Sequence, residues 1–304
     1  MDVSIIIVNY NTKQLLYDCL RSLYANTRDV TFEIIVSDNN STDGSIEMLK
    51  KDFPDVFVIE NYINLGFGKA NNVAAKIAKG KYLFFLNSDT ILLNNAVKFF
   101  FDFAEKRGSG IYGCLLMDAE NNIVHSYEMF TSPLKGLFRT VIQCYQGLYS
   151  ITTIFRKKRT LINSEKLLIE SPIQFIIGAD LFILSADFSE LKGFDENFFM
   201  YFEDEDLCRR ALKKNLKCDI LTDAKIVHLE SKSSKIKAKK IEFFENSFLF
   251  YSHRYYSFYQ KLFINIFFVF YSVFRFFDFR FSFRERAEMF LNVAKSFNHR
   301  GSKL

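Results

Sequence analysis

Short hydrophobic runs alternate with amphipathic segments through about residue 90 of the chain. The run at residues 3–8 is continuous and β-branched, which is typical of a strand buried on both faces. Leucines recur at helical spacing over residues 15–24, which predicts a helix after this strand. The same alternation predicts further strands at residues 32–36, 56–60 and 81–86 and further helices at residues 45–51 and 69–78. Short connections between these elements predict a mainly parallel α/β sheet covered by helices on both faces.

Polar clusters follow three of these strands at the points where the strands end. Asn9-Tyr10-Asn11 follows the first strand, residues 38–43 follow the second, and Asn87-Ser88-Asp89 follows residues 81–86. Each cluster alone is typical of an ordinary turn. Ligands of parallel sheets bind outside the carboxyl ends of the strands, so three clusters at one edge predict a binding site there. Asp89, where a buried strand stops, is well placed to hold a divalent metal ion.

The densest group of carboxylates comes late in the chain. Glu203, Asp204, Glu205 and Asp206 follow an aromatic run at residues 198–202. Crowded carboxylates beside apolar rings repel one another and lose hydration, which raises at least one pKa toward the range of a general base. Together with Asp89, this group indicates an enzyme that activates a hydroxyl group while it neutralises a diphosphate leaving group. We expect Glu205 and Asp206 to act structurally, with Asp206 starting a helix at residues 207–212.

The pattern of strands and helices weakens between residues 119 and 171. We expect a variable and mobile insert there, bordering the site. Regular structure resumes over residues 174–184, which predict one buried strand interrupted by small residues. Gly178 and Ala179 within it would let a ligand approach the backbone closely.

Composition narrows the class of protein. The 304 residues are 49% hydrophobic and 25% charged, which excludes a disordered chain and a polytopic membrane protein. A net charge of +5 is far below that of a dedicated nucleic-acid binder, so we expect no nucleic-acid partner. Five cysteines without a C-x-x-C spacing support neither a disulfide framework nor a structural zinc site. The amino terminus shows no secretion signal, and we expect a cytoplasmic protein.

From residue 241 onward the chain turns aromatic and basic. The uncharged segment at residues 262–274 is too short to cross a bilayer, since a spanning helix needs about 20 apolar residues. It predicts either a helix in the membrane interface, which its many phenylalanines favour, or a helix packed on the catalytic domain. Lysines at residues 232–240 and Arg275, Arg280, Arg284 and Arg286 indicate either a solvated surface or contact with anionic lipid. We therefore divide the chain into a catalytic domain, residues 1–235, and a helical, membrane-associating region, residues 236–304.

Five motifs occur in order along the catalytic part. They are VSIIIVNYN at residues 3–11, SDNNSTDGS at 37–45, NLGFG at 64–68, LNSD at 86–89 and GFDENFFMYFED at 193–204. Together they resemble family 2 glycosyltransferases, most closely the bacterial rhamnosyltransferase-like branch, over about residues 1–120 and 172–235. The resemblance implies the GT-A fold, a Rossmann-like, mainly parallel sheet with flanking helices. It also implies transfer, with inversion, of a sugar from a nucleoside diphosphate to an acceptor hydroxyl.

The resemblance also implies roles for single residues. Asp204 corresponds to the catalytic base, and Glu203 orients the base or the acceptor. Asp89 and His228 would bind Mg²⁺ or Mn²⁺, with Asn87 in place of the first acid of the family's D-x-D motif. The nucleotide sugar would contact Tyr10, Asn11, Asp38, Asn64, Gly66, Asn71, Asn87, Ser88 and Asp180. Among these, Asp38 would accept a hydrogen bond from the pyrimidine base, and Asp180 would touch the donor sugar or the acceptor.

The reaction expected first is transfer of rhamnose from dTDP-rhamnose to a lipid-linked saccharide in cell-surface polysaccharide biosynthesis. The enzyme would work at the inner face of the cell membrane and contact an anionic membrane surface through its C-terminal region. UDP-hexose and UDP-galactofuranose donors stay open. Nucleotidyl transfer onto a sugar phosphate would need a glycine-rich basic loop, which residues 9–13 lack. The alternative from a different functional class is a non-catalytic module that binds nucleotide sugars. The presence of Asp89, Asp204 and His228 argues against it.

Overall fold

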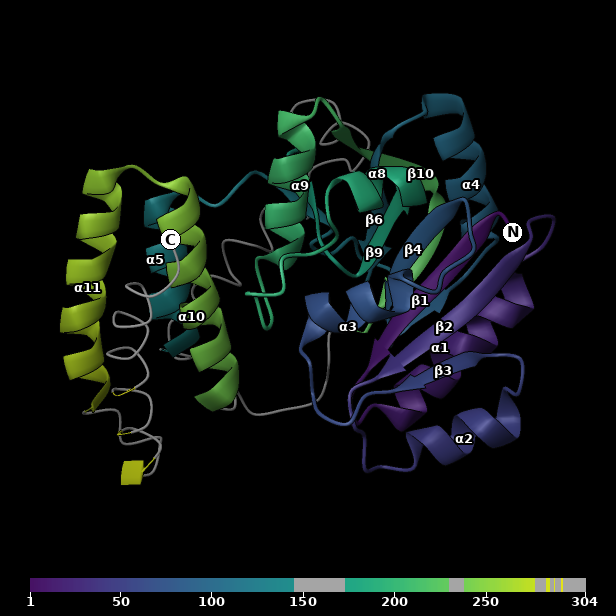
Figure 1. Ribbon diagram of the computed structural model, residues 1–304, viewed down its shortest axis with the longest axis horizontal. Coiled ribbons are helices and arrows are strands. Elements are labelled where there is room, and N and C mark those ends of the chain that lie inside the picture. Colours follow the sequence, from purple (N-terminus) through teal and green to yellow (C-terminus); the bar gives the residue numbers. More distant parts are fainter. Residues whose placement is uncertain (145–172, 230–237, 277–282, 285–286, 288–290, 292–304) are drawn as a thin grey trace. The chain divides into compact units, whose positions relative to one another are not determined.

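The chain folds into two structural units (Figure 1). The structure, a computed structural model, describes residues 1–144, 173–229 and 238–276 and positions 283, 284, 287 and 291. The first unit holds Met1–Phe130, Lys158–Phe199 and Glu203–Lys232. The second holds Thr131–Lys157, Met200–Phe202 and Ser233–Leu304. Part of the expected insert therefore belongs with the C-terminal region.

An eight-stranded sheet with the order β3-β2-β1-β4-β9-β6-β10-β5 lies at the centre of the first unit. Its strands are β1 (Val3–Asn9), β2 (Phe32–Asp38), β3 (Phe57–Glu60), β4 (Tyr82–Asn87), β5 (Thr90–Leu92), β6 (Gly110–Met117), β9 (Asp180–Leu184) and β10 (Lys217–His228). β1 pairs in parallel with β2 and β4, and β2 with β3. β9 runs antiparallel between β4 and β6, β10 runs parallel to β6, and β5 runs antiparallel to β10. The prediction of a mainly parallel sheet is confirmed.

Helices cover both faces of this sheet. They are α1 (Lys13–Asn26), α2 (Ser45–Asp52), α3 (Phe67–Ala75), α4 (Ala96–Arg107), α8 (Ser185–Glu190) and α9 (Glu203–Lys213). Ile5 and Ile7 of β1 join a core with residues of α1, α2 and α4. Ile6 joins a second core with residues of α3, α8 and α9. Because alternate side chains of β1 enter different cores, the strand needs the continuous apolar run that its sequence shows.

Two predicted elements differ from the structure. Residues 174–184 form two short strands, because β8 (Phe175–Ile176) leaves the main sheet and pairs with β7 (Tyr127–Glu128). The helix predicted at residues 207–212 begins at Glu203, so Asp206 lies inside the first turn of α9. Four carboxylates in that turn face the positive end of the helix dipole, which favours the earlier start. About half of the expected mobile insert, from residue 145 onward, lies outside the described residues.

The described part of the second unit includes the helices α5 (Pro133–Cys144), α10 (Ala238–Tyr255) and α11 (Phe258–Phe276). They pack against one another (Figure 1) around the fully buried Phe248, Tyr251 and Phe268. The hydroxyl of Tyr256 donates to the carbonyl oxygen of Thr131 at 2.6 Å, which ties α10 to the chain entering α5. Within the described ranges, no helix is long and apolar enough to cross a membrane. The basic positions at residues 232–237, Arg280 and Arg286 lie outside the described residues.

Candidate active site

The polar clusters predicted from the sequence meet at one edge of the sheet. Asn9 and Asp38 are register partners at the ends of β1 and β2. Asn87, at the end of β4, is the register partner of Val8. Since β1, β2 and β4 are parallel, their carboxyl ends lie at the same edge, as predicted. His228 ends β10 at this edge too, because β10 runs parallel to β6, and both β6 and β4 are antiparallel to β9.

Asp38 is held inside this edge. Its side chain is 1% exposed; Oδ2 accepts from Nδ2 of Asn9 at 2.6 Å and Oδ1 from the N–H of Ser41 at 2.8 Å. These bonds give Asp38 a supporting role for the loop after β2. Its contact with a pyrimidine base stays a prediction, and the exposed candidates beside it are Tyr10 and Asn11.

The segment around Gly66 is tied to the chain that leads to the acidic group. Oδ1 of Asn64 accepts from the N–H of Gly66 at 2.9 Å, and the N–H of Phe67 donates to the carbonyl oxygen of Phe199 at 2.9 Å. Asn71 lies inside α3, 1% exposed, and donates to the carbonyl oxygen of Phe67. Asn64 is half-buried and the better placed of these residues to meet a nucleotide.

Asn87, Asp89 and His228 come together as the motif comparison implies. Oδ1 of Asp89 lies 3.2 Å from Nε2 of His228, and Nδ2 of Asn87 lies 3.4 Å from the same nitrogen. The N–H of Leu229 donates to the carbonyl oxygen of Asp89 at 2.9 Å, which joins the strand end to β10. Ser88 contacts Thr12 through their hydroxyl oxygens at 2.9 Å.

The donor atoms of this group suit a hard or borderline divalent cation. A carboxylate and an amide oxygen are ligands that Mg²⁺ or Mn²⁺ accepts, and the imidazole nitrogen suits a borderline cation better than a hard one. The described part of the chain has no group of three or more His, Cys, Asp or Glu side chains that could hold a metal alone. Asn87, Asp89 and His228 fit a cation that takes part of its ligands from the protein and the rest from substrate phosphates, as Mg²⁺ often does.

Asp204 lies in the first turn of α9, half-buried. Its Oδ2 accepts from the N–H of Gly178 at 2.9 Å, and its Oδ1 from the N–H of Glu205 at 2.8 Å. Burial raises the pKa of Asp204, although these hydrogen bonds and the charge of His125 act in the opposite direction. A raised pKa in a carboxylate of this group was predicted, and its direction is confirmed.

Glu203 is more deeply buried than its neighbour. It is 5% exposed, and its Oε2 has no hydrogen-bond partner among the described residues. Burial raises the pKa of Glu203 well above its usual range, and the negative charge of Asp204 adds to the shift. Glu203 therefore favours the protonated form, which leaves the ionised form to Asp204.

Glu205 and Asp206 serve the structure, as predicted. Asp206 is fully buried and accepts from Nε of Arg210 at 2.7 Å. Arg210 also donates through Nη2 to the carbonyl oxygen of Gly193 at 2.8 Å, so this pair fastens α9 to the preceding loop. Glu205 lies 3.8 Å from Arg209 one turn further on.

Asp180 lies beneath the site. Its side chain is fully buried, and Oδ2 accepts from the N–H of Cys114 at 2.6 Å. Burial raises the pKa of Asp180 to about 7, and the charge of His228 acts the other way. With no exposed surface, Asp180 is placed to support β9 and β6, which argues against direct contact with a sugar.

His125 is a further candidate site residue, which sequence reasoning missed. It precedes β7, its Nε2 lies 3.0 Å from Oε2 of Glu128, and its charge reaches Asp204. The surrounding pattern is weak, and the only available signal was that the chain has just four histidines.

One turn connects the two halves of the site. The N–H of Gly178 binds Asp204, and the carbonyl oxygen of the next residue, Ala179, accepts from the N–H of Asn87 at 3.0 Å. The candidate base and the candidate metal motif are thus fixed to consecutive residues. A mainly parallel sheet with flanking helices and such a polar site at its carboxyl edge is the arrangement of the GT-A glycosyltransferase fold.

Solved structures share this fold. S. aureus TarS 1–349 in complex with UDP superposes with a TM-score of 0.54 at 17% identity, over 100% of this chain and 72% of that one. The mannosyltransferase PcManGT from Pyrobaculum calidifontis, in complex with GDP-Man and Mn²⁺, gives a TM-score of 0.54 at 12% identity, over 99% of this chain and 76% of that one.

Sequence comparison gives the family. Residues 4–162, more than half of the chain, match the glycosyl transferase family 2 model. The chain belongs to glycosyl transferase family 2 and is a glycosyltransferase.

Named relatives cover the chain to different extents. Rhamnosyltransferase WbbL of Escherichia coli is 27% identical over 218 residues, 68% of this chain and 76% of the relative. The N-acetylglucosaminyl-diphospho-decaprenol L-rhamnosyltransferase of Mycobacterium tuberculosis is 26% identical over 243 residues, 76% of each chain. The poly(ribitol-phosphate) β-glucosyltransferase of Bacillus spizizenii is 39% identical over 116 residues, which are 36% of this chain and only 18% of that protein. The expected rhamnosyltransferase-like character is confirmed at the level of the family.

Proposed function

We propose that the chain is an inverting, metal-dependent glycosyltransferase that moves a sugar from a nucleoside diphosphate to a hydroxyl group of a lipid-linked saccharide. The observation that carries the proposal is the turn at Gly178 and Ala179, which binds Asp204 through one residue and Asn87 through the next. A base and a diphosphate-binding motif must share one sugar ring in such a reaction.

Asp204 takes the proton of the acceptor hydroxyl. As the proton moves to the carboxylate, the acceptor oxygen forms a bond to the anomeric carbon, and the bond from that carbon to the diphosphate oxygen breaks on the opposite face. Burial suits Asp204 for this step, since a raised pKa brings a carboxylate closer to the proton affinity that a base needs near neutral pH. Glu203, in its protonated form, positions the base without competing for the proton.

Asp89 and His228, with Asn87 beside them, would hold Mg²⁺ or Mn²⁺. When bound, such a cation neutralises the charge of the departing diphosphate. Ser88 and Thr12 next to this group offer hydroxyl groups to the same region, and Tyr10, Asn11 and Asn64 offer the exposed or half-buried surface for the nucleotide.

Rhamnose from dTDP-rhamnose is the first donor to test. Two relatives that cover two thirds or more of this chain are named rhamnosyltransferases. A UDP-hexose or UDP-galactofuranose donor is the alternative, supported by a glucosyltransferase relative named for UDP-Glc.

A lipid-linked acceptor is supported by the same relatives, one named for a decaprenol diphosphate and one for a diphosphoundecaprenol substrate. Such an acceptor places the enzyme at a membrane surface. We assign it to the inner face of the cell membrane, in cell-surface polysaccharide biosynthesis, and the C-terminal region to contact with anionic lipid.

The test is a screen of sugar nucleotides by thermal stabilisation, with and without Mg²⁺ or Mn²⁺. A ligand that binds only the folded state raises its apparent stability by about 2.7 kcal/mol at a concentration 100 times its Kd. We expect one donor to stabilise the protein in a metal-dependent way, and Asp89→Asn or His228→Ala to remove the metal dependence. The control is Asn94→Ala, at an amide outside the site. Failure of every donor to stabilise the wild type with either metal would contradict the proposal.

A further inference from the structure

Helix α11 is apolar on its outer as well as its inner side. Ile264, Phe268 and Tyr271 are buried against the other helices of the second unit. The outer side is exposed and carries six apolar residues, here called the apolar face: Leu262, Phe263, Ile266, Val269, Phe270 and Val273. An amphipathic helix of a soluble protein would show polar residues there. An exposed apolar side of this kind is typical of a surface that binds a partner.

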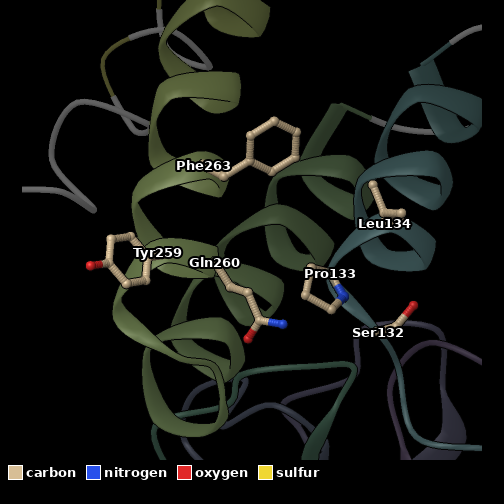
Figure 2. Close-up of a pocket in the computed structure, with 6 residues that line it drawn as sticks. All are labelled: Ser132, Pro133, Leu134, Tyr259, Gln260 and Phe263. Atoms are coloured by element: carbon tan, nitrogen blue, oxygen red, sulfur yellow. The ribbon is translucent and has the colours of Figure 1, made fainter.

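Helix α5 extends the apolar face. Its Leu134 is 72% exposed and its Phe138 is 60% exposed. A groove of about 370 Å³ runs between the two helices, lined mainly by Pro133, Leu134, Tyr259 and Phe263. Figure 2 shows the side chains of Leu134 and Phe263 projecting into the space between the helices. The exposed apolar surface is therefore formed by two segments that are more than 100 residues apart in the sequence.

The charges on both helices have one sign. α5 and α11 carry Lys135, Arg139, Lys261 and Arg275 and no aspartate or glutamate. Basic side chains beside an apolar surface complement anionic lipid head groups. A second copy of this chain would instead bring like charges together, which opposes association.

We infer that α5 and α11 together form a surface that docks on an anionic lipid bilayer. The apolar face and the groove enter the boundary between head groups and acyl chains, and Lys135, Arg139 and Lys261 contact lipid phosphates. The inference rests on the proposed function, because a lipid-linked acceptor gives the enzyme a reason to bind a membrane. It differs from a C-terminal anchor alone because α5, from the middle of the chain, supplies part of the surface.

Vesicle binding tests the surface directly. The full chain is sedimented with vesicles of phosphatidylcholine alone or mixed with phosphatidylglycerol, without donor or acceptor. We expect binding to the anionic vesicles only, weakened by salt. Phe263→Glu with Phe270→Glu should weaken it at least about tenfold, since each exposed phenylalanine loses its transfer into the lipid. The matched control is Phe57→Glu on β3, because Phe57 is 57% exposed against 53% for Phe263.

Two further double variants separate the contribution of α5 to vesicle binding from the contribution of the basic residues. Leu134→Glu with Phe138→Glu should also weaken binding, and Lys135→Glu with Lys261→Glu should remove the preference for anionic vesicles. None of these four positions is buried, so the variants should keep the helices folded. Deletion from Phe263 onward would instead remove the buried Ile264 and Phe268.

Equal binding to neutral and anionic vesicles, or unchanged binding of the folded α5 variant, would overturn the inference. A further outcome would also overturn the inference. In it, the wild-type protein forms a dimer in sedimentation analysis and does not bind vesicles, and the apolar-face variants are monomeric. None of these measurements uses sugar transfer, so a failure here is distinct from a failure of the proposed enzyme activity.

Discussion

The N–H of Gly178 donates to Oδ2 of Asp204 at 2.9 Å and fixes this carboxylate to the turn before β9. That turn also accepts the N–H of Asn87 through Ala179. A hydrogen bond to the ionised form of Asp204 limits how far burial can raise the pKa of this carboxyl group. The arrangement holds a base in place and keeps it able to ionise.

Asp204→Asn should lower the rate of transfer by about 10²–10⁴-fold, the usual contribution of a general base. Binding of the nucleotide donor should change little, because the amide preserves the size of the side chain and the metal-side residues are untouched. Turnover of the preferred donor and donor affinity by thermal shift measure the two effects separately.

The matched control for this substitution is Asp52→Asn, at an exposed carboxylate near the end of α2. It should leave both turnover and binding unchanged. Equal losses of affinity and rate in Asp204→Asn would assign Asp204 to substrate binding and not to proton transfer.

His125→Gln should move the acidic limb of the pH–rate profile to higher pH. The charge of His125 lowers the pKa of Asp204, so its removal lets burial raise that pKa further. The base must be ionised to act, so activity then appears only at higher pH than in the wild type. The profile of kcat/KM reports this pKa in the free enzyme.

His253→Gln, in the second unit, is the control for a histidine without a role in proton transfer. A limb that stays in place or moves to lower pH in His125→Gln would show that His125 does not influence the base.

The strands around the site could be predicted from the sequence because each has a strong local signal. β1 begins at the expected residue and extends one residue further, to Asn9. Its isoleucines at residues 5–7 are a strong local signal because they enter the cores on both faces of the sheet. The polar ends of β1, β2 and β4 could be brought to one edge by the rule for parallel sheets alone.

Long-range pairing could not be predicted. The antiparallel insertion of β9 between β4 and β6 depends on the register of Asp180 with Leu86, which no local pattern encodes. The same holds for the approach of His125 to Asp204 and for the union of α5 with α10 and α11. The burial of the Asp38 and Asp180 carboxylates could not be predicted either, because it depends on packing by segments that are distant in the sequence.

Asp180→Asn should remove the part of the pH dependence of the free energy of unfolding that comes from Asp180. Burial raises the pKa of Asp180 in the folded state from 3.8 to about 7. The unfolded chain loses this proton at lower pH, so the free energy of unfolding falls as pH rises toward 7. Between about pH 5 and about pH 8 the wild type should lose roughly 2–3 kcal/mol that the variant keeps.

Denaturant unfolding at both pH values measures this difference. Asp55→Asn, at an exposed carboxylate, serves as the control and should follow the wild type. Parallel stability curves for the wild type and Asp180→Asn would mean that Asp180 is ionised in the folded protein.

Gly66→Ala should destabilise the protein and disturb the site. Gly66 has a φ of +82°, and a Cβ there would lie 2.2 Å from the carbonyl oxygen of Phe199. With a ψ of −176°, Gly66 adopts a conformation that is essentially open to glycine only, which costs a residue with a Cβ about 1–3 kcal/mol. The clash with backbone should add about 1–3 kcal/mol.

Gly108→Ala separates these two contributions. Gly108 has a φ of +85°, and a Cβ there would meet nothing within 4 Å, so only the conformational cost applies. We expect Gly66→Ala to lose at least about 1 kcal/mol more than Gly108→Ala in denaturant unfolding. It should also weaken donor binding, because relief of the clash moves Phe199 and the chain that leads to Glu203 and Asp204. Equal losses of stability in the two variants would show that the segment around Phe199 yields freely and does not hold the site in place.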